Sequence, residues 1–222
     1  MSYYELKYDI NLLGYQILSG LLAIWNNANK NFLNEYEEWY NNEHLYERLS
    51  VPDINIARRF VSLKSNYNYF TSYEATTPKT FFSNEYINKL NNPTKKTKFV
   101  MEFVFKDMSR TVFERKVING SIRGAFCLII AIKDKLKKEV LIEYEKNNRC
   151  QEQVYSEIWL AREIKDFVTS KEESLRGKDN KFESCLYIEF CNENDSIISM
   201  KKAKKNFKNA EIGTYKLISY LF

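Results

Sequence analysis

The chain's only histidine, His44, lies in its densest group of side chains able to do chemistry. That segment, residues 38–52, also carries three carboxylates, an arginine and three large aromatic rings. Four nearby side chains recur at a spacing of four and would form one stripe along a helix: Tyr36, Tyr40, His44 and Arg48. This arrangement makes the segment the first candidate for a reactive site.

Histidine titrates nearest to neutral pH, so His44 is suited to proton transfer. Glu47 lies three residues further on and could reach His44 on the same helix surface, where it would fix the tautomer of the imidazole and raise its basicity. Alternatively, His44 packs near the end of a helix and only offsets the helix dipole. From spacing alone both roles stay open.

The elements that must position these side chains follow one order twice. The first half predicts a strand at 15–25, a helix at 31–49 that Pro52 ends, strands at 54–64 and 67–75, a helix at 79–90, and an ambiguous stretch at 97–118. After a boundary at 119–121, the second half predicts strands at 123–132, 154–164, 183–191 and 213–221, helices at 136–148 and 195–207, and a charged loop at 169–181. In the ambiguous stretch, a strand and a short helix followed by a strand at 109–118 fit equally well.

Each half therefore has the order β-α-β-β-α-β, which is that of a ferredoxin-like unit. We expect an α+β fold of two tandem units, residues 1–119 and 120–222. In each unit helices would cover one face of the sheet and leave the other open, and Phe60, Tyr69 and Tyr73 are expected on the open face of the first. Two open faces could meet as an intramolecular α/β barrel with an internal cavity.

Composition bounds the remaining possibilities. The chain has 222 residues, 44% of them hydrophobic, and a net charge of +5 in which both signs are mixed along the sequence. We expect a cytoplasmic protein with no membrane contact, because no apolar run approaches the ~20 residues of a membrane span and no signal peptide is visible. The lysine clusters at 95–98 and 201–205 lack interleaved aromatic residues, so no nucleic-acid partner is expected.

Cofactors are not indicated by the sequence either. Four cysteines without a C-x-x-C pair and a single histidine argue against a zinc site. Glycine-rich nucleotide-binding motifs and the H-E-x-x-H motif are absent from the sequence. We therefore expect no metal and no cofactor.

Residues 39–52 spell W-Y-N-N-E-H-L-Y-E-R-L-S-V-P. This run resembles the W-Y-x-x-E-H-x-P-E-R-L stretch of the EthD-like branch of the dimeric α/β-barrel superfamily. Four later segments are similar as well: Ala57–Phe60, Tyr69–Glu74, Asn92–Thr94 and Met108–Val112. The chain departs from the pattern at Tyr46, where the family usually has proline, and at Asp53, where it has glycine. The resemblance covers about residues 15–117, and the second half matches only in the order of its elements.

The resemblance implies site residues and a range of reactions. His44 takes the place of the family's motif histidine and Glu43 that of the acidic residue before it, so both are expected to be catalytic. The superfamily includes cyclases, dehydratases, isomerases, cofactor-free oxygenases and members without established chemistry. The resemblance and the expected cavity together predict a cofactor-independent enzyme that acts by acid/base chemistry on a hydrophobic, polyketide-like or aromatic molecule.

Six side chains are expected to contact the substrate: Trp39, Tyr40, Arg48, Arg59, Tyr69 and Tyr73. Arg59 could hold a carboxylate or enolate, although only one of Arg58 and Arg59 can face the cavity because neighbours on a strand point oppositely. The alternatives are a non-catalytic ligand-binding or assembly protein of the same fold, and a cofactor-free oxygenase. The chain is expected to be a monomer or a homodimer.

Overall fold

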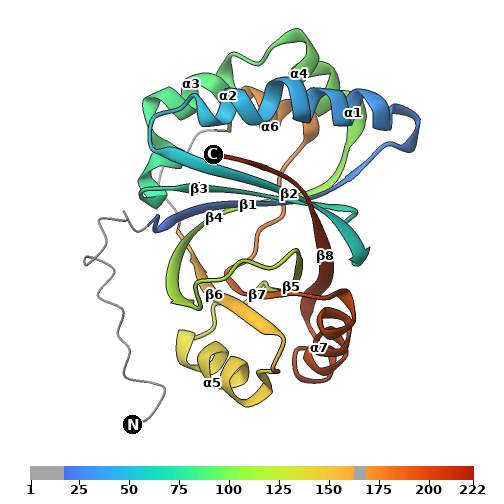
Figure 1. Ribbon diagram of the computed structural model, residues 1–222. Helices are drawn as coiled ribbons and strands as arrows, with labels where there is room; N and C mark the ends of the chain where they lie inside the picture. The colour runs from blue at the N-terminus through green and yellow to red at the C-terminus, as the bar shows by residue number, and fades with distance from the viewer. Residues whose placement is uncertain (1–17, 163–168) are drawn as a thin grey trace.

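Eight strands close into an antiparallel barrel in the computed structural model, which describes residues 18–162 and 169–222 (Figure 1). In chain order the strands are β1 (Gly20–Ala28), β2 (Ile54–Lys64), β3 (Tyr69–Ala75), β4 (Phe105–Asn119), β5 (Phe126–Ile132), β6 (Gln153–Ala161), β7 (Ser184–Phe190) and β8 (Ala210–Leu221). Around the barrel they follow the order β4-β1-β3-β2-β8-β5-β7-β6, and β6 pairs with β4 to close the ring.

The two halves of the chain have the same internal strand order. The first contributes β4-β1-β3-β2 and the second the equivalent β8-β5-β7-β6, with the seams at β2–β8 and β4–β6. The predicted α+β fold is confirmed: two tandem ferredoxin-like units form an intramolecular α/β barrel.

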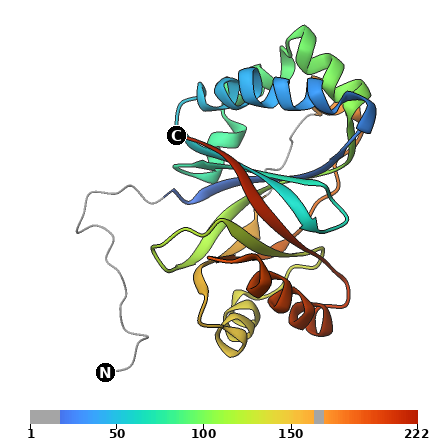
Figure 2. The same ribbon diagram turned by 45° about the vertical axis from the view of Figure 1, so that its right-hand side comes forward.

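Helices cover the outer face of the barrel on two sides (Figures 1 and 2). The helices in chain order are η2 (Lys30–Phe32), α1 (Leu33–Trp39), η3 (Tyr40–His44), α2 (Leu45–Leu49), η4 (Pro78–Phe82), α3 (Asn84–Asn91), α4 (Lys95–Phe99), η5 (Val100–Val104), α5 (Lys138–Asn148), α6 (Lys171–Arg176) and α7 (Glu193–Asn206). Although α6 belongs to the second half, it packs against α3 and η5 in the helix layer of the first. Within the described residues, every helix is too short or too polar to cross a membrane.

The helical segment that carries His44 contains a wide turn. In η3 the amide of Leu45 donates to the carbonyl of Tyr40, five residues earlier, which is the π-helical pattern often found at functional sites. Side chains four residues apart drift round an α-helix, because a turn holds only about 3.6 residues. The wider turn offsets this drift, and the whole predicted stripe is buried: Tyr36, Tyr40, His44 and Arg48.

The turn after α2 has a left-handed residue at Asp53, where the resembled sequence pattern has glycine. Helix α2 ends at Leu49, before Pro52, as predicted. Asp53 then has a φ of 68°, in the left-handed region that glycine adopts freely and aspartate tolerates better than most residues. Aspartate can therefore occupy this left-handed position at the entry into β2.

The barrel interior is packed with side chains from both units. Its buried members include Leu21, Trp25, Phe60, Phe70, Phe113, Ile129, Trp159, Cys185, Tyr187 and Tyr215. Trp159 stacks on Tyr187 and on Phe70, with ring centroids 5.1 Å and 6.4 Å apart. The faces that were expected to enclose a cavity meet through these rings, which bind the two units into one core.

The prediction that three aromatic residues share the open face is wrong for two of them. Phe60 points into the barrel, whereas Tyr69 and Tyr73 lie on the outer face of the wall, beneath the helices. Arg58 and Arg59 point oppositely, as expected: Arg58 contacts Glu189 inside the barrel, and Arg59 contacts α1 outside it. The predicted site therefore lies between the barrel wall and the helices of the first unit, not inside the barrel.

An ion network crosses the barrel interior beside the aromatic core. Six charged side chains of both units take part, three of each sign: Arg58, Glu74, Arg115, Arg123, Glu157 and Glu189. Burial would raise the pKa of the Glu157 carboxyl, but Arg115 and Arg58 lower it below its ordinary range. The network thus keeps buried charge paired across the seams between the units.

The secondary structure of two segments differs from the simplest prediction. Residues 97–118 fold as the end of α4, then η5, then β4, so the second of the two readings is nearer to the structure. The predicted loop at 169–181 contains α6. Residues 15–17 of the first predicted strand, and 163–164 of the strand predicted at 154–164, lie outside the described residues.

Candidate functional site

His44 is held by aromatic rings between the helices and the barrel wall. It is buried, with 3% of its surface exposed, and it stacks on Trp39 with ring centroids 4.0 Å apart and planes 26° apart. The rings of Tyr40 and Tyr73 stand nearly perpendicular to it, with centroids 5.4 Å and 6.3 Å away. Trp39 is itself fixed, because its indole N–H donates to the Thr97 hydroxyl at 3.0 Å. His44 thus has a defined orientation.

The surroundings of His44 favour its neutral form. Burial lowers the pKa of the imidazole well below its ordinary value, and the positive charge of Arg48 lowers it further, while Glu172 opposes the shift. The Glu47 carboxylate lies 3.7 Å from Nδ1, within ion-pair range but beyond a hydrogen bond. At neutral pH the imidazole is therefore uncharged and able to accept a proton.

This shift gives a testable dependence of stability on pH. Because His44 is the only histidine, its ionisation can be followed between about pH 6.5 and 5.5, above the range of most carboxyls. As pH falls below about 6.5, the unfolded state binds the proton before the folded state does, so the free energy of unfolding decreases. We expect a loss of about 1 kcal/mol over that interval that His44→Gln lacks, measured by urea denaturation. Equal pH dependence in the two proteins would contradict the assigned pKa.

Arg48 is the cation of the site. It is buried beside His44 and its Nη2 donates to Oε1 of Glu172 at 2.5 Å. Burial alone would lower the pKa of the guanidinium, but the Glu172 carboxylate raises it, so Arg48 stays charged. The Tyr86 ring lies 5.6 Å from its guanidinium carbon, which adds a cation–π contact. Glu172 comes from α6, so both halves of the chain contribute to the site.

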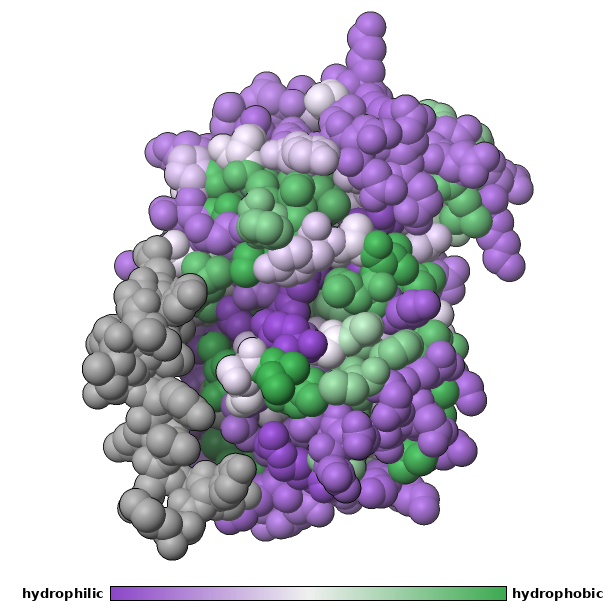
Figure 3. Space-filling model, in the orientation of Figure 1, coloured by the Kyte–Doolittle hydropathy of each residue, from purple (hydrophilic) through white to green (hydrophobic). Residues whose placement is uncertain are grey.

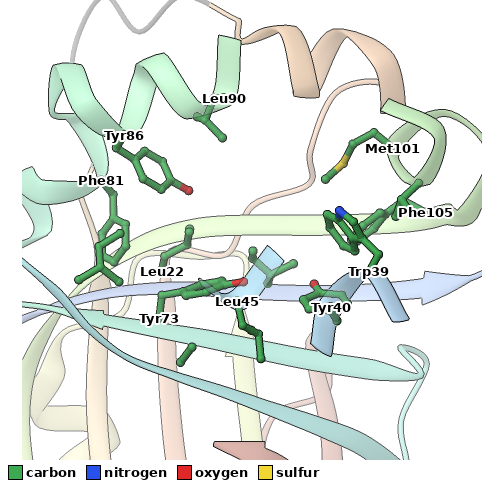
Figure 4. Close-up of a cluster of buried hydrophobic side chains, with 14 of the residues drawn as sticks. Leu22, Trp39, Tyr40, Leu45, Tyr73, Phe81, Tyr86, Leu90, Met101 and Phe105 are labelled. Carbon is green, nitrogen blue, oxygen red and sulfur yellow. The ribbon is translucent and has the colours of Figure 1, made fainter. Parts of the chain in front are cut away.

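Several buried polar atoms of this region make no hydrogen bond to any residue that the structure describes. They include Nδ1 of His44, Nη1 of Arg48 and the hydroxyls of Tyr40 and Tyr73. Figure 4 shows the hydroxyl ends of Tyr40 and Tyr73 pointing toward one another and that of Tyr86 pointing into the same space. Burial raises the pKa of the Tyr40 and Tyr73 phenols, which keeps both as donors. A buried polar atom without a partner costs about 1–3 kcal/mol, so this cluster favours a bound polar group.

Three of the sequence-predicted site residues contact other parts of the structure. Glu43 accepts hydrogen bonds from Thr94 at 2.6 Å and Thr97 at 3.2 Å, so it ties η3 to the start of α4. Arg59 pairs with Glu37 at 2.9 Å and covers the Tyr40 ring at 4.0 Å. Tyr69 packs against Tyr36, with ring centroids 4.8 Å apart. These contacts favour supporting roles for Glu43, Arg59 and Tyr69, whereas His44, Trp39, Tyr40, Arg48 and Tyr73 come together.

Two residues of the cluster, Tyr86 and Glu172, were not expected from the sequence. Tyr86 fitted the apolar face of a predicted helix, and only the fold shows its hydroxyl accepting from Arg110 at 3.1 Å. Glu172 lay in the predicted loop, although Ser170 and Glu173 form the S-x-x-E pattern of a helix start, and the Ser170 hydroxyl indeed accepts from the Glu173 amide. Among the described residues, no three His, Cys, Asp or Glu side chains are placed to hold a metal ion.

Solved structures with a similar fold were found by comparison with known proteins. No family model and no curated protein matches the sequence. A solved anthrone oxidase-like protein superposes with a TM-score of 0.58 at 6% identity, over 91% of this chain and 92% of that one. A proposed monooxygenase from Fusobacterium nucleatum gives 0.51 at 9% identity over 91% and 94%. A chlorite dismutase variant from Candidatus Nitrospira defluvii gives 0.52 at 10% identity over 95% and 94%.

The chain has the dimeric α/β-barrel fold. All three matched structures belong to this superfamily and are matched over nearly their whole length, so both units of the barrel are included in each match. The match is consistent with the resemblance of residues 39–52 to the EthD-like branch. At these identities the α/β barrel establishes architecture, and the reaction has to be argued from the side chains.

Proposed function

We propose that the chain is a cofactor-independent enzyme that binds a hydrophobic small molecule between the helices and the barrel wall of its first unit. The proposal depends on one observation: neighbouring buried polar atoms of His44, Arg48 and Tyr73 have no hydrogen-bond partner among the described residues. Apolar side chains such as Leu22, Leu45, Phe81 and Met101 belong to the same buried cluster as Tyr73 (Figure 4). A mostly apolar site with a few converging polar groups is the usual composition of a small-molecule site.

In this proposal His44 carries the proton. The neutral imidazole takes a proton from a carbon next to a carbonyl group, and the electron pair moves to the carbonyl oxygen as an enolate. Arg48 and the Tyr73 hydroxyl can stabilise this oxygen, and His44 returns the proton to another carbon or to a departing hydroxyl. Because burial and Arg48 keep the pKa of His44 low, the site suits a substrate whose own C–H bond is acidic. Isomerisation, cyclisation and dehydration all fit this sequence of steps.

A cofactor-free oxygenase is a second candidate with specific support. Two of the matched structures are described as an anthrone oxidase-like protein and a monooxygenase. The same carbanion that His44 would generate could react with O2 instead of being reprotonated. Oxygen uptake during turnover separates this candidate from the acid/base enzyme.

A non-catalytic binding or assembly role also has an observation in its favour. The end of β8 exposes three large apolar side chains, Ile218, Tyr220 and Phe222, and Figure 3 shows a hydrophobic patch where the chain ends. Such patches often mark a contact with a partner. In that case the packed barrel would serve as a scaffold and His44 would have no effect on any reaction.

The test starts from a ligand retained by protein purified from its own host and detected by native mass spectrometry. We expect His44→Gln to lower kcat on this molecule by at least about 100-fold while the ligand is still retained, because a positioned general base contributes about 10²–10⁴-fold. Tyr46→Phe is the matched control on the same helical segment, since Tyr46 is 57% exposed. Turnover by His44→Gln within about twofold of the unmodified protein would reject the role of His44.

A further inference from the structure

We propose that the ligand of this site carries an anionic oxygen that binds Arg48, and that Glu172 of α6 determines how strongly the site selects for that charge. This inference rests on the proposed function, which places a small molecule at the same cluster. It goes further by naming the chemical class: a flat, apolar molecule with a carboxylate or phenolate group at one end.

One terminal nitrogen of the Arg48 guanidinium is hydrogen-bonded to the protein, and the other is not. Its Nη2 donates to Glu172, whereas its Nη1 is buried and makes no hydrogen bond to the described residues. Guanidinium nitrogens only donate, so the partner of Nη1 must be an acceptor. An ionised oxygen forms a hydrogen bond of roughly twice the strength of a neutral one. With Glu172 on Nη2, the N–H groups of Nη1 are the donors that remain for an anionic oxygen of a ligand.

The electrostatics at His44 show which sign the site favours. After burial, the charges with the largest effects on its pKa are those of Arg48, Glu172, Arg59 and Arg176, of which only Glu172 is negative. The Glu47 carboxylate, 3.7 Å from Nδ1, adds a second negative group, so three cations face two carboxylates around the imidazole. In addition, the Tyr73 hydroxyl has no partner among the described residues and can donate to a bound oxygen, because burial keeps the phenol protonated.

Arg48 is better suited to this role than the other buried cations of the region. Both terminal nitrogens of Arg59 donate to Glu37, which leaves only its Nε without a partner in the described part of the chain, and Arg176 forms two hydrogen bonds with Asp179, at 2.7 Å and 3.0 Å. The predicted anion-binding role of Arg59 therefore moves, in this proposal, to Arg48. Glu172 acts through Arg48 and is a positioning residue.

Helix α6 is held in place by hydrogen bonds at its start and after its end. The Ser170 hydroxyl caps its start, and the Lys171 amide donates to the Asn91 side chain at the end of α3. After the helix, Asn180 exchanges backbone hydrogen bonds with β4, to Met108 at 3.1 Å and from Arg110 at 3.0 Å. These contacts fix Glu172 opposite Arg48, so the second unit sets the charge of a site built on the first.

The experiment compares probes of the same shape and different charge by isothermal titration calorimetry. One pair is 1-naphthoate and 1-naphthamide, and the second is 4-nitrophenolate and 4-nitroanisole. We expect the folded protein to bind one of the anions at least about tenfold more tightly than its neutral partner. Glu172→Gln should increase this preference about fivefold or more, because the neighbouring negative charge is lost while the hydrogen-bond acceptor remains. The preferred pair distinguishes a carboxylate ligand from a phenolate ligand.

The double variant Arg48→Met/Glu172→Met removes both charges together and so avoids a lone buried ion. We expect it to bind both members of each pair equally. If the unmodified protein shows no charge preference, or if the double variant retains it, the anion-binding inference is wrong while the proposed site stands. Failure of all four probes to bind would overturn the inference and the proposed site together.

Discussion

Replacing Glu172 by alanine is expected to lower the free energy of unfolding by about 3–5 kcal/mol, because it leaves Arg48 charged and unpaired in the interior. Both side chains are nearly fully buried, at 2% and 3% exposure, and they are joined at 2.5 Å. The substitution also removes the ion pair between Glu172 of α6 and Arg48 of α2. Urea denaturation followed by circular dichroism measures the loss.

Two controls separate the charge effect from the loss of packing. The double variant Arg48→Met/Glu172→Met keeps apolar volume at both positions and should recover most of the stability, since a buried pair replaced by well-packed apolar residues is often neutral. Glu173→Ala removes a half-buried carboxylate from the next position of α6 and should cost less than about 1 kcal/mol. A loss below about 1 kcal/mol for Glu172→Ala would show that Arg48 finds another partner.

The order of the elements could be predicted because each strand and helix has a strong local pattern. The alternation over residues 54–64 and 67–75 gave strands that the structure places at Ile54–Lys64 and Tyr69–Ala75. The repeated order of elements then indicated two ferredoxin-like units, and their strand orders are equivalent. Likewise, the stripe from Tyr36 to Arg48 depended only on spacing, and the π-helical turn preserved it.

Which face of each strand points into the barrel could not be predicted, because both faces of the wall are buried. Strand β3 is buried at nearly every position, with Phe70 inside the barrel and Tyr73 outside it. Both faces therefore carry large rings, and alternation alone does not say which lies beneath the helices. Local sequence patterns could not predict the partner of Arg48 for another reason: Glu172 lies 124 residues away in the sequence.

The carboxylate of Glu157 is a fully buried acceptor in the barrel interior. Its side chain has 0% exposure and accepts two hydrogen bonds from Arg115, at 2.5 Å and 2.9 Å. The Tyr155 hydroxyl and the Trp159 indole N–H also donate to it, each at 2.5 Å. Since Arg115 lies on β4 and Glu157 on β6, this carboxylate joins the two units at one of their seams.

Glu157→Ala is accordingly expected to be strongly destabilising, with a loss of about 5 kcal/mol or more in the free energy of unfolding. It weakens the pairing of buried Arg115 and leaves two buried donors unsatisfied, and the sum is comparable with the whole stability of a typical domain, about 5–15 kcal/mol. Glu114→Ala on β4 is the matched control: its carboxylate is 24% exposed and pairs with Lys116 and Arg162 at the surface, so it should cost at most about 1 kcal/mol. Chemical denaturation of both variants tests the ranking, and Glu157→Gln extends it if the alanine variant does not fold. Equal losses at the two positions would mean that the ion network contributes little to holding the units together.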